Sequence, residues 1–297
     1  MTSRAGADQG SGAETVEVAG RQVRVTHRDK VLYPATGTTK GDVVAYYRAV
    51  APVMLPHVVG RPATRKRWVD GVGAEPFFEK NLPAGTPPWV ARREQQHQER
   101  TAVYPLVDDE ATLVWCAQVA ALEIHVPQWR FGDDGRPRHP DRLVLDLDPG
   151  KGAGLGECVE VALALRERLR ELDLEPVPVT SGSKGVHLYA ALDGTRTSQE
   201  VTDLAHELAA AVEHDHPDLV VSRMAKAERV GKVLVDWSQN TASKTTVAPY
   251  SLRGRERPWV AAPRTWRELT HPRLRQLEWR EVLQRVRRRG DPMRTIG

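Results

Sequence analysis

The sequence of 297 residues contains only two cysteines, Cys116 and Cys158, and their spacing is not that of a metal-binding motif. No apolar run approaches the roughly 20 residues of a membrane-spanning helix, and the polar N-terminus lacks the apolar segment of a signal peptide. These absences argue against a disulfide-rich scaffold, a zinc–cysteine fold and a membrane protein. We therefore expect a reduced protein of the cytoplasm.

The chain also lacks a large excess of either charge, because its formal net charge is only +4. The basic residues are nevertheless clustered, in RKRW at Arg65–Trp68 and in RVRRR at Arg285–Arg289, and the sequence pI is about 9.1. Clustered arginine and lysine suit phosphate backbones. For the C-terminal cluster we favour the alternative, a solvated helix face, because nothing near it in sequence indicates chemistry.

The length allows one large domain or two compact lobes, without an internal repeat or a long linker. Residues 1–18 are rich in small and polar residues and are predicted to be a disordered tail, although alternation from Val16 to Thr26 also suggests a hairpin. Apolar periodicity predicts helices at about 156–172 and 198–214. The segment 176–192 is typical of two strands joined by a tight polar loop.

The stretch RLVLDLDP at Arg142–Pro149 carries the strongest chemical signal. Side chains alternate along a strand, so Asp146 and Asp148 project from one face. A third carboxylate, Asp236, ends another β-branched run that could lie beside the first. Adjacent carboxylates repel unless a cation joins them, and oxygen ligands favour magnesium or manganese. The alternative, without metal binding, is that the D-x-D pattern only ends a surface strand or opens a turn.

A second group of residues suits a triphosphate. The loop from Ser181 to Gly185 brings together hydroxyls, a lysine and glycines, which let a ligand come close to the backbone amides. Its spacing is not that of a Walker loop. His187 begins the following strand and could hydrogen-bond a phosphate or sugar. Arg253 and Arg255 lie two residues apart on a segment predicted to be extended, where they could neutralise a leaving pyrophosphate.

The N-terminal region offers a possible phosphate pocket. Thr39 or Asp42 can cap a helix that has Lys40 at its positive end, a position that favours binding of an anion there, with Lys30 nearby. Exposure of both lysines to solvent is the equal alternative.

Two further features lie between this pocket and the acidic strand. Phe77 and Phe78 are two of only three phenylalanines, and we expect one to pack in the core and the other to offer a stacking surface for an unpaired base. The segment LEIHVPQW is predicted to be a strand beside the acidic strand, and it would bring up His125.

Taken together and in order, these motifs resemble the polymerase domain of bacterial DNA ligase D, a branch of the archaeo-eukaryotic primase (Prim-Pol) superfamily. The resemblance covers about residues 27–290. It depends on the segments DKVLYPATGTTK, MLPHVVGRPATRKRW, FFEK, LEIHVPQWRF, LVLDLDPG, TSGSKGVHLY, VLVDWSQN, KTTVAPYSLRGR and AAPRTW.

The resemblance implies an α/β (α+β) fold: a primase-like catalytic core of mixed and antiparallel sheets flanked by helices, with a smaller N-terminal part. Residues 19–297 would then form a single primase-polymerase domain. Within it, residues 19–110 would be the part that holds a DNA end, residues 111–260 the catalytic core and residues 261–297 a helical cap. No nucleotidyl-lysine motif of a ligase is present.

The resemblance also implies a role for each site residue. Catalysis and the binding of two manganese or magnesium ions would fall to Asp146, Asp148 and Asp236. The incoming NTP or dNTP would be held by Lys66, His125, Ser181, Ser183, Lys184, His187, Arg253 and Arg255. A 5′-phosphate on DNA would be bound by His27, Lys30 and Lys40, and the template by Phe77, Phe78 and Gln239.

The sequence departs from the family pattern at two of these segments. His27 stands where we expect asparagine in the phosphate pocket, and its imidazole can still donate to phosphate. Trp237 replaces a tyrosine seen in many relatives, which should be neutral.

The implied function is nucleotide addition, preferentially of ribonucleotides, to 3′ ends at gaps and double-strand breaks, in non-homologous end joining or gap repair. Its partners would be DNA with a 5′-phosphate at a gap or overhang and, as further possibilities, the Ku protein and an ATP-dependent DNA ligase, with the protein associated with the nucleoid. Two alternatives stay open: a primase that starts chains without a primer, and a non-catalytic bridge between DNA ends.

Overall fold

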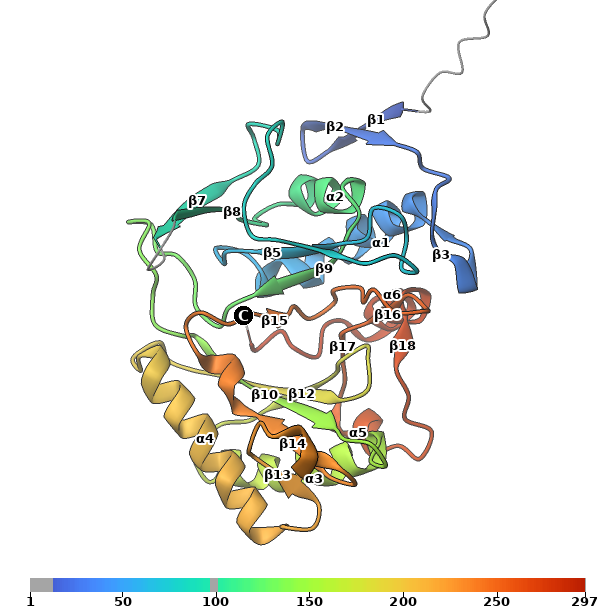
Figure 1. Ribbon diagram of the computed structural model, residues 1–297. Coiled ribbons are helices and arrows are strands. Elements are labelled where there is room, and N and C mark those ends of the chain that lie inside the picture. The colour runs from blue at the N-terminus through green and yellow to red at the C-terminus, as the bar shows by residue number, and fades with distance from the viewer. Residues whose placement is uncertain (1–12, 97–100, 297) are drawn as a thin grey trace, which may run out of the picture.

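Two separate β-sheets, each with its own helices, organise the chain (Figure 1). The computed structural model describes residues 13–96 and 101–296. The larger sheet has six strands in the order β13 (Val220–Val221), β14 (Val233–Asp236), β10 (Arg142–Pro149), β12 (Val186–Ala191), β11 (Val177–Thr180) and β17 (Ala262–Pro263). Its strands are antiparallel except for the parallel pair β13–β14. The fold is therefore the expected mixed α/β type.

The smaller sheet has four antiparallel strands. They run in the order β15 (Thr246–Val247), β9 (Ala121–Val126), β5 (Thr64–Arg67) and β6 (Phe77–Glu79). Two of these strands precede residue 110 and two follow it, so the expected division at that residue does not separate the two sheets. The prediction that the His125 strand lies beside the acidic strand is wrong. Strand β10 already has β12 and β14 on its two sides, and β9 pairs with β5 and β15 instead.

The helices cover the two sheets from opposite ends of the molecule. Helices α3 (Leu155–Arg170) and α4 (Ser198–Asp215) bury their apolar stripes against leucines and valines of the six-stranded sheet, close to the predicted bounds. Helices α1 (Lys40–Met54) and α2 (Glu110–Gln118) pack with the four-stranded sheet in a second core. None of the helices within residues 13–96 and 101–296 has the length and apolar character that a bilayer crossing requires.

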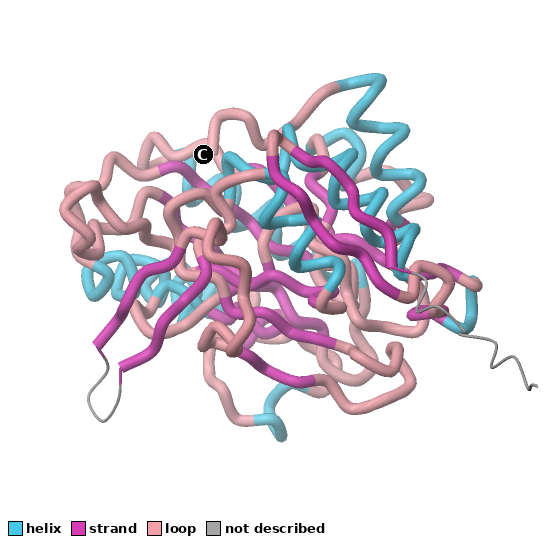
Figure 2. The backbone as a smooth tube through the Cα atoms, turned by 90° about the horizontal axis from the view of Figure 1, so that it is seen from above, coloured by secondary structure: helices cyan, strands magenta, loops and turns pink. Residues whose placement is uncertain are grey.

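The remaining elements are short. Strands β7 and β8 form a hairpin that projects beyond the other elements (Figure 2). In the C-terminal region two strands accompany the two helices, so the expected cap is only partly helical. The bounds are β1 (Ala13–Val18), β2 (Arg21–Thr26), β3 (Val31–Tyr33), β4 (Thr38–Thr39), β7 (Arg92–Gln96), β8 (Thr101–Pro105), β16 (Trp259–Val260), β18 (Leu277–Glu278), α5 (Trp266–Leu269), α6 (Trp279–Arg289), and the 3₁₀ turns η1 (Pro34–Thr36), η2 (Leu55–His57), η3 (Lys226–Arg229) and η4 (Trp237–Asn240).

The N-terminal hairpin corrects the expected extent of the tail. Strands β1 and β2 pair antiparallel around Ala19 and Gly20, which both have positive φ. Residues 13–18 therefore belong to a strand, and the predicted tail is too long at its C-terminal end. The rest of the predicted tail, residues 1–12, lies outside the described residues.

Candidate active site

Three aspartates meet where β10 and β14 pair. Asp146 lies directly opposite Asp236 in the antiparallel register, and Asp148 follows two residues later on the same face. Such opposed residues have Cβ atoms about 4.5–5.5 Å apart. Leu145 and Leu147, which alternate with the aspartates along β10, are fully buried in the core formed with α3 and α4. Strand alternation therefore commits the leucines to the core and directs the carboxylates to the other face of the sheet.

The electrostatics of this group favour a cation. Burial raises the pKa of Asp146 well above its usual range, and the nearby Asp148 and Asp236 raise it further. Burial and Asp236 also raise the pKa of Asp148, against the opposing effect of nearby arginines. The chemistry of the donors, three hard oxygen ligands with crowded negative charge, fits Mn²⁺ or Mg²⁺.

The carboxylate of Asp236 is engaged in hydrogen bonds within its own segment. Among the described residues, no group of three or more Asp, Glu, His or Cys side chains is set out as a metal-binding cluster. The carboxylate of Asp236 instead accepts hydrogen bonds from the backbone and hydroxyl of Ser238 and from Gln239 Nε2, at 2.6–3.0 Å. Holding a metal would require Asp236 to exchange some of these bonds. Gln239, expected at the template, thus lies beside the acidic group.

The serine-rich loop lies next to the aspartates, as the turn of the β11–β12 hairpin. Ser181 Oγ accepts hydrogen bonds from the backbone amides of Ser183 and Gly185. A Cβ on Gly185 would lie 1.9 Å from the carbonyl oxygen of Leu147, so only glycine allows the loop to approach the acidic strand this closely. Lys184 is exposed at the tip of the turn. The predicted strand–loop–strand structure is confirmed.

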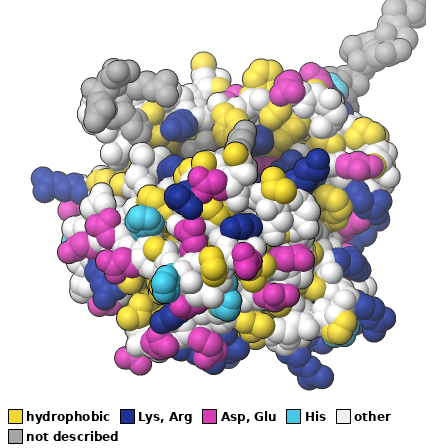
Figure 3. Space-filling model, turned by 60° about the horizontal axis from the view of Figure 1, so that its bottom comes forward, with side chains coloured by type: hydrophobic (Ala, Val, Ile, Leu, Met, Phe, Trp, Pro, Cys, Tyr) yellow, Lys and Arg dark blue, Asp and Glu magenta, His cyan; other side chains and the backbone are white. Residues whose placement is uncertain are grey.

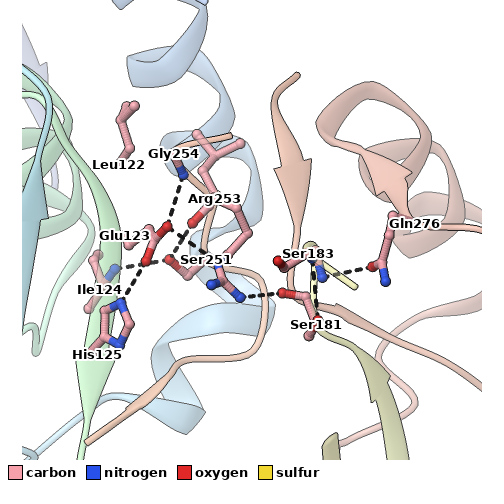
Figure 4. Close-up of polar contacts among 12 residues, drawn as sticks. Leu122, Glu123, Ile124, His125, Ser181, Ser183, Ser251, Arg253, Gly254 and Gln276 are labelled. Atoms are coloured by element: carbon pink, nitrogen blue, oxygen red, sulfur yellow. Dashed lines mark hydrogen bonds and ion pairs between the residues drawn. The ribbon is translucent and has the colours of Figure 1, made fainter. Parts of the chain in front are cut away.

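Gln276 holds this loop from the other side (Figure 4). Its side chain accepts a hydrogen bond from the amide of Gly182 at 2.8 Å and donates one to the carbonyl of Gly185 at 3.2 Å. The glutamine comes from the C-terminal segment, far from the loop in sequence. Sequence reasoning missed it because no local motif connects the two segments.

His187 approaches the acidic group from β12. Its Nε2 lies 3.3 Å from Asp146 Oδ1, and its Nδ1 is buried without a hydrogen-bond partner in the described structure. Burial, together with Arg253 and His125, lowers the pKa of His187 to about 3. The imidazole is therefore neutral at physiological pH.

A buried glutamate that the sequence did not point to connects the two sheets (Figure 4). Glu123, on β9, is 2% exposed. Its carboxylate accepts hydrogen bonds from Gly254 N at 3.0 Å and His125 Nε2 at 2.8 Å, and pairs with Arg253 Nε at 3.3 Å. Arg253 in turn donates to the carbonyl of Ser181 in the loop of the other sheet. Burial alone would raise the pKa of Glu123, but His125 and Arg253 lower it overall, so the carboxylate stays ionised.

The two predicted arginines differ in their surroundings. Arg253 is held by these contacts, whereas Arg255 is exposed. Both lie close enough to Asp148 to lower the pKa of its carboxyl group. The segment that carries them therefore brings positive charge to the acidic group, as expected.

The four-stranded sheet adds a basic and aromatic surface. Lys66 Nζ lies 4.9 Å from the ring centroids of both Trp68 and Phe78, and the Phe78 ring lies 6.3 Å from that of His125. Phe77 and Phe78 are 58% and 65% exposed, so the prediction that one of them packs in the core is wrong. The reason is that β6 is an edge strand, and neither ring belongs to any of the hydrophobic core clusters.

The three residues predicted to bind a 5′-phosphate line one cavity, separate from the acidic group. His27, Lys30 and Lys40 line a cavity of about 360 Å³ together with Arg67, a residue of the basic cluster RKRW that the sequence did not assign to this pocket. Thr39 caps α1 through a reciprocal capping box with Asp42, which places Lys40 at the first helical position. Burial lowers the pKa of Lys40, and the charges of Lys30 and Arg67 lower it further. An anion would relieve this crowding.

The two sheets, the acidic strands and the nearby loop define a primase-polymerase domain. The family model described as "LigD, primase-polymerase domain" matches residues 39–293, and the chain belongs to this family. The sequence is 54% identical over 276 residues to the multifunctional non-homologous end joining DNA repair protein LigD of Mycobacterium tuberculosis, and 30% identical over 275 residues to the bifunctional LigD of Bacillus subtilis. Each alignment covers 91% of this chain, but only 36% and 43% of these longer relatives.

A solved structure supports the same assignment. The polymerase domain of Mycobacterium tuberculosis Ligase D, determined in complex with DNA, superposes with a TM-score of 0.90 at 54% identity. The match covers 92% of this chain and 97% of that one. The likeness thus extends through both sheets, and the resemblance inferred from the sequence motifs is confirmed.

Proposed function

We propose that this chain is a DNA-dependent nucleotidyltransferase that adds nucleotides to 3′ ends at gaps and double-strand breaks during non-homologous end joining or gap repair. The observation that carries the proposal is the register that sets Asp146 opposite Asp236, next to the loop at Ser181–Gly185. Carboxylates beside a polar loop that carries an exposed lysine suit a nucleoside triphosphate. The relatives' names, and the DNA bound to the Mycobacterium tuberculosis domain, indicate the same chemistry.

In this proposal each group of residues has its own task. Asp146, Asp148 and Asp236 would hold two divalent cations, Mn²⁺ or Mg²⁺. When bound, such ions activate a 3′-hydroxyl and neutralise charge on the triphosphate. Arg253, Arg255 and Lys184 would offset charge on the leaving pyrophosphate. Lys66, His125, Ser181, Ser183 and the neutral His187 would position the incoming nucleotide.

DNA would be held at two places outside the acidic group. The pocket of His27, Lys30, Lys40 and Arg67 would bind the 5′-phosphate of a gap or overhang. The exposed rings of Phe77 and Phe78 would stack on unpaired template bases. Ku and an ATP-dependent ligase are the proposed protein partners, and ribonucleotides the preferred substrates.

The test is primer extension on a duplex with a short gap, with and without a 5′-phosphate at its far side. Ribonucleotides and deoxyribonucleotides are compared, each with Mn²⁺ or Mg²⁺. We expect extension that is strongest with ribonucleotides and Mn²⁺ and that is weaker without the 5′-phosphate. Products formed without any primer strand would instead indicate a primase, and DNA binding without extension under all conditions would indicate a non-catalytic bridge.

A further inference from the structure

Arginines gather in a cavity that has no part in the proposed reaction. The cavity, of about 610 Å³, lies among α5, the segment 271–277 and α6. Seven of the residues that line it are arginines, and Glu268 is the one acid among them. Figure 3 shows Lys and Arg side chains along the right-hand edge, the side on which α5 and β18 lie in Figure 1. We call this cavity the arginine pocket.

The acids around the arginine pocket neutralise only part of this charge. Glu268 is shared by Arg285 and Arg289, and Glu281, next to the pocket, pairs with Arg275. Three other lining arginines, Arg267, Arg273 and Arg288, are exposed and make no ion pair with a carboxylate in residues 13–96 and 101–296. Positive charge is therefore left over inside a concave surface.

A buried arginine belongs to the same pocket. Arg264 is 6% exposed, and its guanidinium donates from Nε to Thr180 Oγ1 at 3.0 Å and from Nη2 to the carbonyl of Arg275. Burial lowers the pKa of Arg264 to about 10, and the neighbouring Arg285 contributes in the same direction, against the opposing charges of Glu268 and Glu281. A buried guanidinium held by two neutral acceptors and crowded by other cations has no carboxylate hydrogen-bonded to it in the described structure. An anion in the cavity would supply the missing charge.

The arginine pocket adjoins the loop at Ser181–Gly185 on the side of Gln276. Gln276, which clamps Gly182 and Gly185, stands between two lining residues, Arg275 and Leu277. Arg264 binds Thr180, the residue just before Ser181. The pocket is thus connected by hydrogen bonds to the loop at Ser181–Gly185, unlike a row of arginines along a free helix face.

We infer that the arginine pocket is a binding site for phosphate groups, separate from the acidic group and from the pocket of Lys30 and Lys40. Guanidinium groups grouped in a concavity match the paired oxygens of phosphate. The phosphates could belong to the backbone of duplex DNA or to a free polyphosphate. This inference does not rest on the proposed polymerase reaction, because none of the three aspartates lines the pocket.

The test compares two triple variants of equal charge. One changes the unpaired pocket arginines (Arg267→Gln, Arg273→Gln, Arg288→Gln), and the control changes three exposed arginines that do not line the pocket (Arg280→Gln, Arg287→Gln, Arg294→Gln). Binding of sodium tripolyphosphate is measured by calorimetry in EDTA, which removes any binding that needs divalent cations. We expect at least about tenfold weaker binding for the pocket variant and less than twofold change for the control. Equal losses in both variants, or no loss in the pocket variant, would overturn the inference.

A second measurement does not depend on the variants. Phenylglyoxal, which modifies arginine, is applied to the wild-type protein with and without tripolyphosphate, and the sites are read by mass spectrometry. Protection of Arg267 and Arg288, but not of Arg280 and Arg287, supports the site; equal protection everywhere contradicts it.

A DNA arm identifies the source of the phosphates. Affinity for a blunt duplex without 5′-phosphates is measured against salt concentration for both variants. If the source is the DNA backbone, the pocket variant loses affinity and the slope of log K against log salt falls by about 2 to 3. If duplex binding is unchanged while tripolyphosphate binding is lost, the source is free polyphosphate.

Discussion

The acidic group on β10 and β14 and the basic pocket beside α1 follow the same physical principle with opposite signs. In the first, mutual repulsion and burial raise the pKa values of Asp146 and Asp148. In the second, burial and the charges of Lys30 and Arg67 lower the pKa of Lys40. In both places like charges are crowded at a cost to stability that a ligand of the opposite charge would offset. This comparison supports the proposal that both are binding sites, and it does so without reference to any relative.

The two regions differ in how the fold builds them. The aspartates meet only because β14 pairs with β10 in one register, and a shift by one residue would turn Asp236 to the other face. Lys40, in contrast, is placed by the local capping box of Thr39 and Asp42. The acidic group therefore depends on the pairing of the sheet, whereas the position of Lys40 in the basic pocket depends on a single helix turn.

The largest expected effect comes from breaking the acidic group. Asp146→Asn should reduce nucleotide addition by about a thousandfold or more, because it removes a central metal ligand. It should also raise the melting temperature, because it relieves repulsion with Asp148 and Asp236. Extension assays and thermal melts check the two effects. Asp218→Asn, at an exposed position, removes the same charge as a control, and lost binding of 5′-phosphorylated ends by Asp146→Asn would contradict the separation of the two regions.

Glu123→Gln tests the connection between the sheets. The amide can still accept from Gly254 N, but it loses the charge that holds Arg253 and His125. We expect kcat to fall about tenfold with a smaller rise in the KM for the nucleotide, and stability to drop by up to about 3 kcal/mol. A raised KM with unchanged kcat would show that Glu123 does not act by positioning Arg253 at the leaving pyrophosphate. Glu110→Gln, at a surface ion pair with Arg48, is the matched control.

Lys40→Met breaks the basic pocket. Affinity for 5′-phosphorylated ends should fall about tenfold through loss of one charged contact, while the melting temperature without DNA should rise because a crowded charge is gone. Competition binding with phosphorylated and unphosphorylated duplexes checks the first effect. Lys151→Met, at an exposed position, is the control; an equal loss of affinity there would point to general charge alone.

The same residue predicts a pH dependence of stability. The folded-state pKa of Lys40 is lowered, so the folded protein binds fewer protons than the unfolded chain at pH values between the two pKa values. Its contribution to stability therefore rises with pH until about 10.4, the pKa of an unfolded lysine, and levels off above it. Thermal melts should show a shallower rise for Lys40→Met than for the wild type.

Much of this site could be predicted from the sequence, because the signals are local. Strand alternation determines that Asp146 and Asp148 share a face, glycine spacing indicates the tight loop after Thr180, and the Thr39–Asp42 pair identifies the helix start. Each depends on residues within a few positions of one another. The pairing of Asp236 with Asp146 was predicted only as a possibility, because register is a property of the folded sheet.

Most of the errors at the site concern contacts between distant segments. Glu123 and Arg67 lie within named segments, but the contacts that give them a place in the site come from other elements. Closeness in sequence predicts the wrong neighbour for the His125 strand, because β9 pairs with β5 and β15 and not with β10. Burial of one phenylalanine was expected because few phenylalanines are exposed in general. The edge position of β6 overrides this tendency.

The smallest expected effect tests those exposed rings. Phe78→Ala should weaken binding of a gapped duplex about fivefold, at the low end of base-stacking energies, and should hardly change the melting temperature. The ring of Phe78 is positioned by contacts with Lys66 and His125. Phe77 has no such ring or cation contact among the described residues. Phe77→Ala should therefore have the smaller effect on affinity, because a ring without fixed neighbours loses more freedom when it stacks. A large drop in melting temperature with unchanged DNA affinity would instead mean that the rings serve packing, and only the charged regions would then remain as sites of DNA recognition.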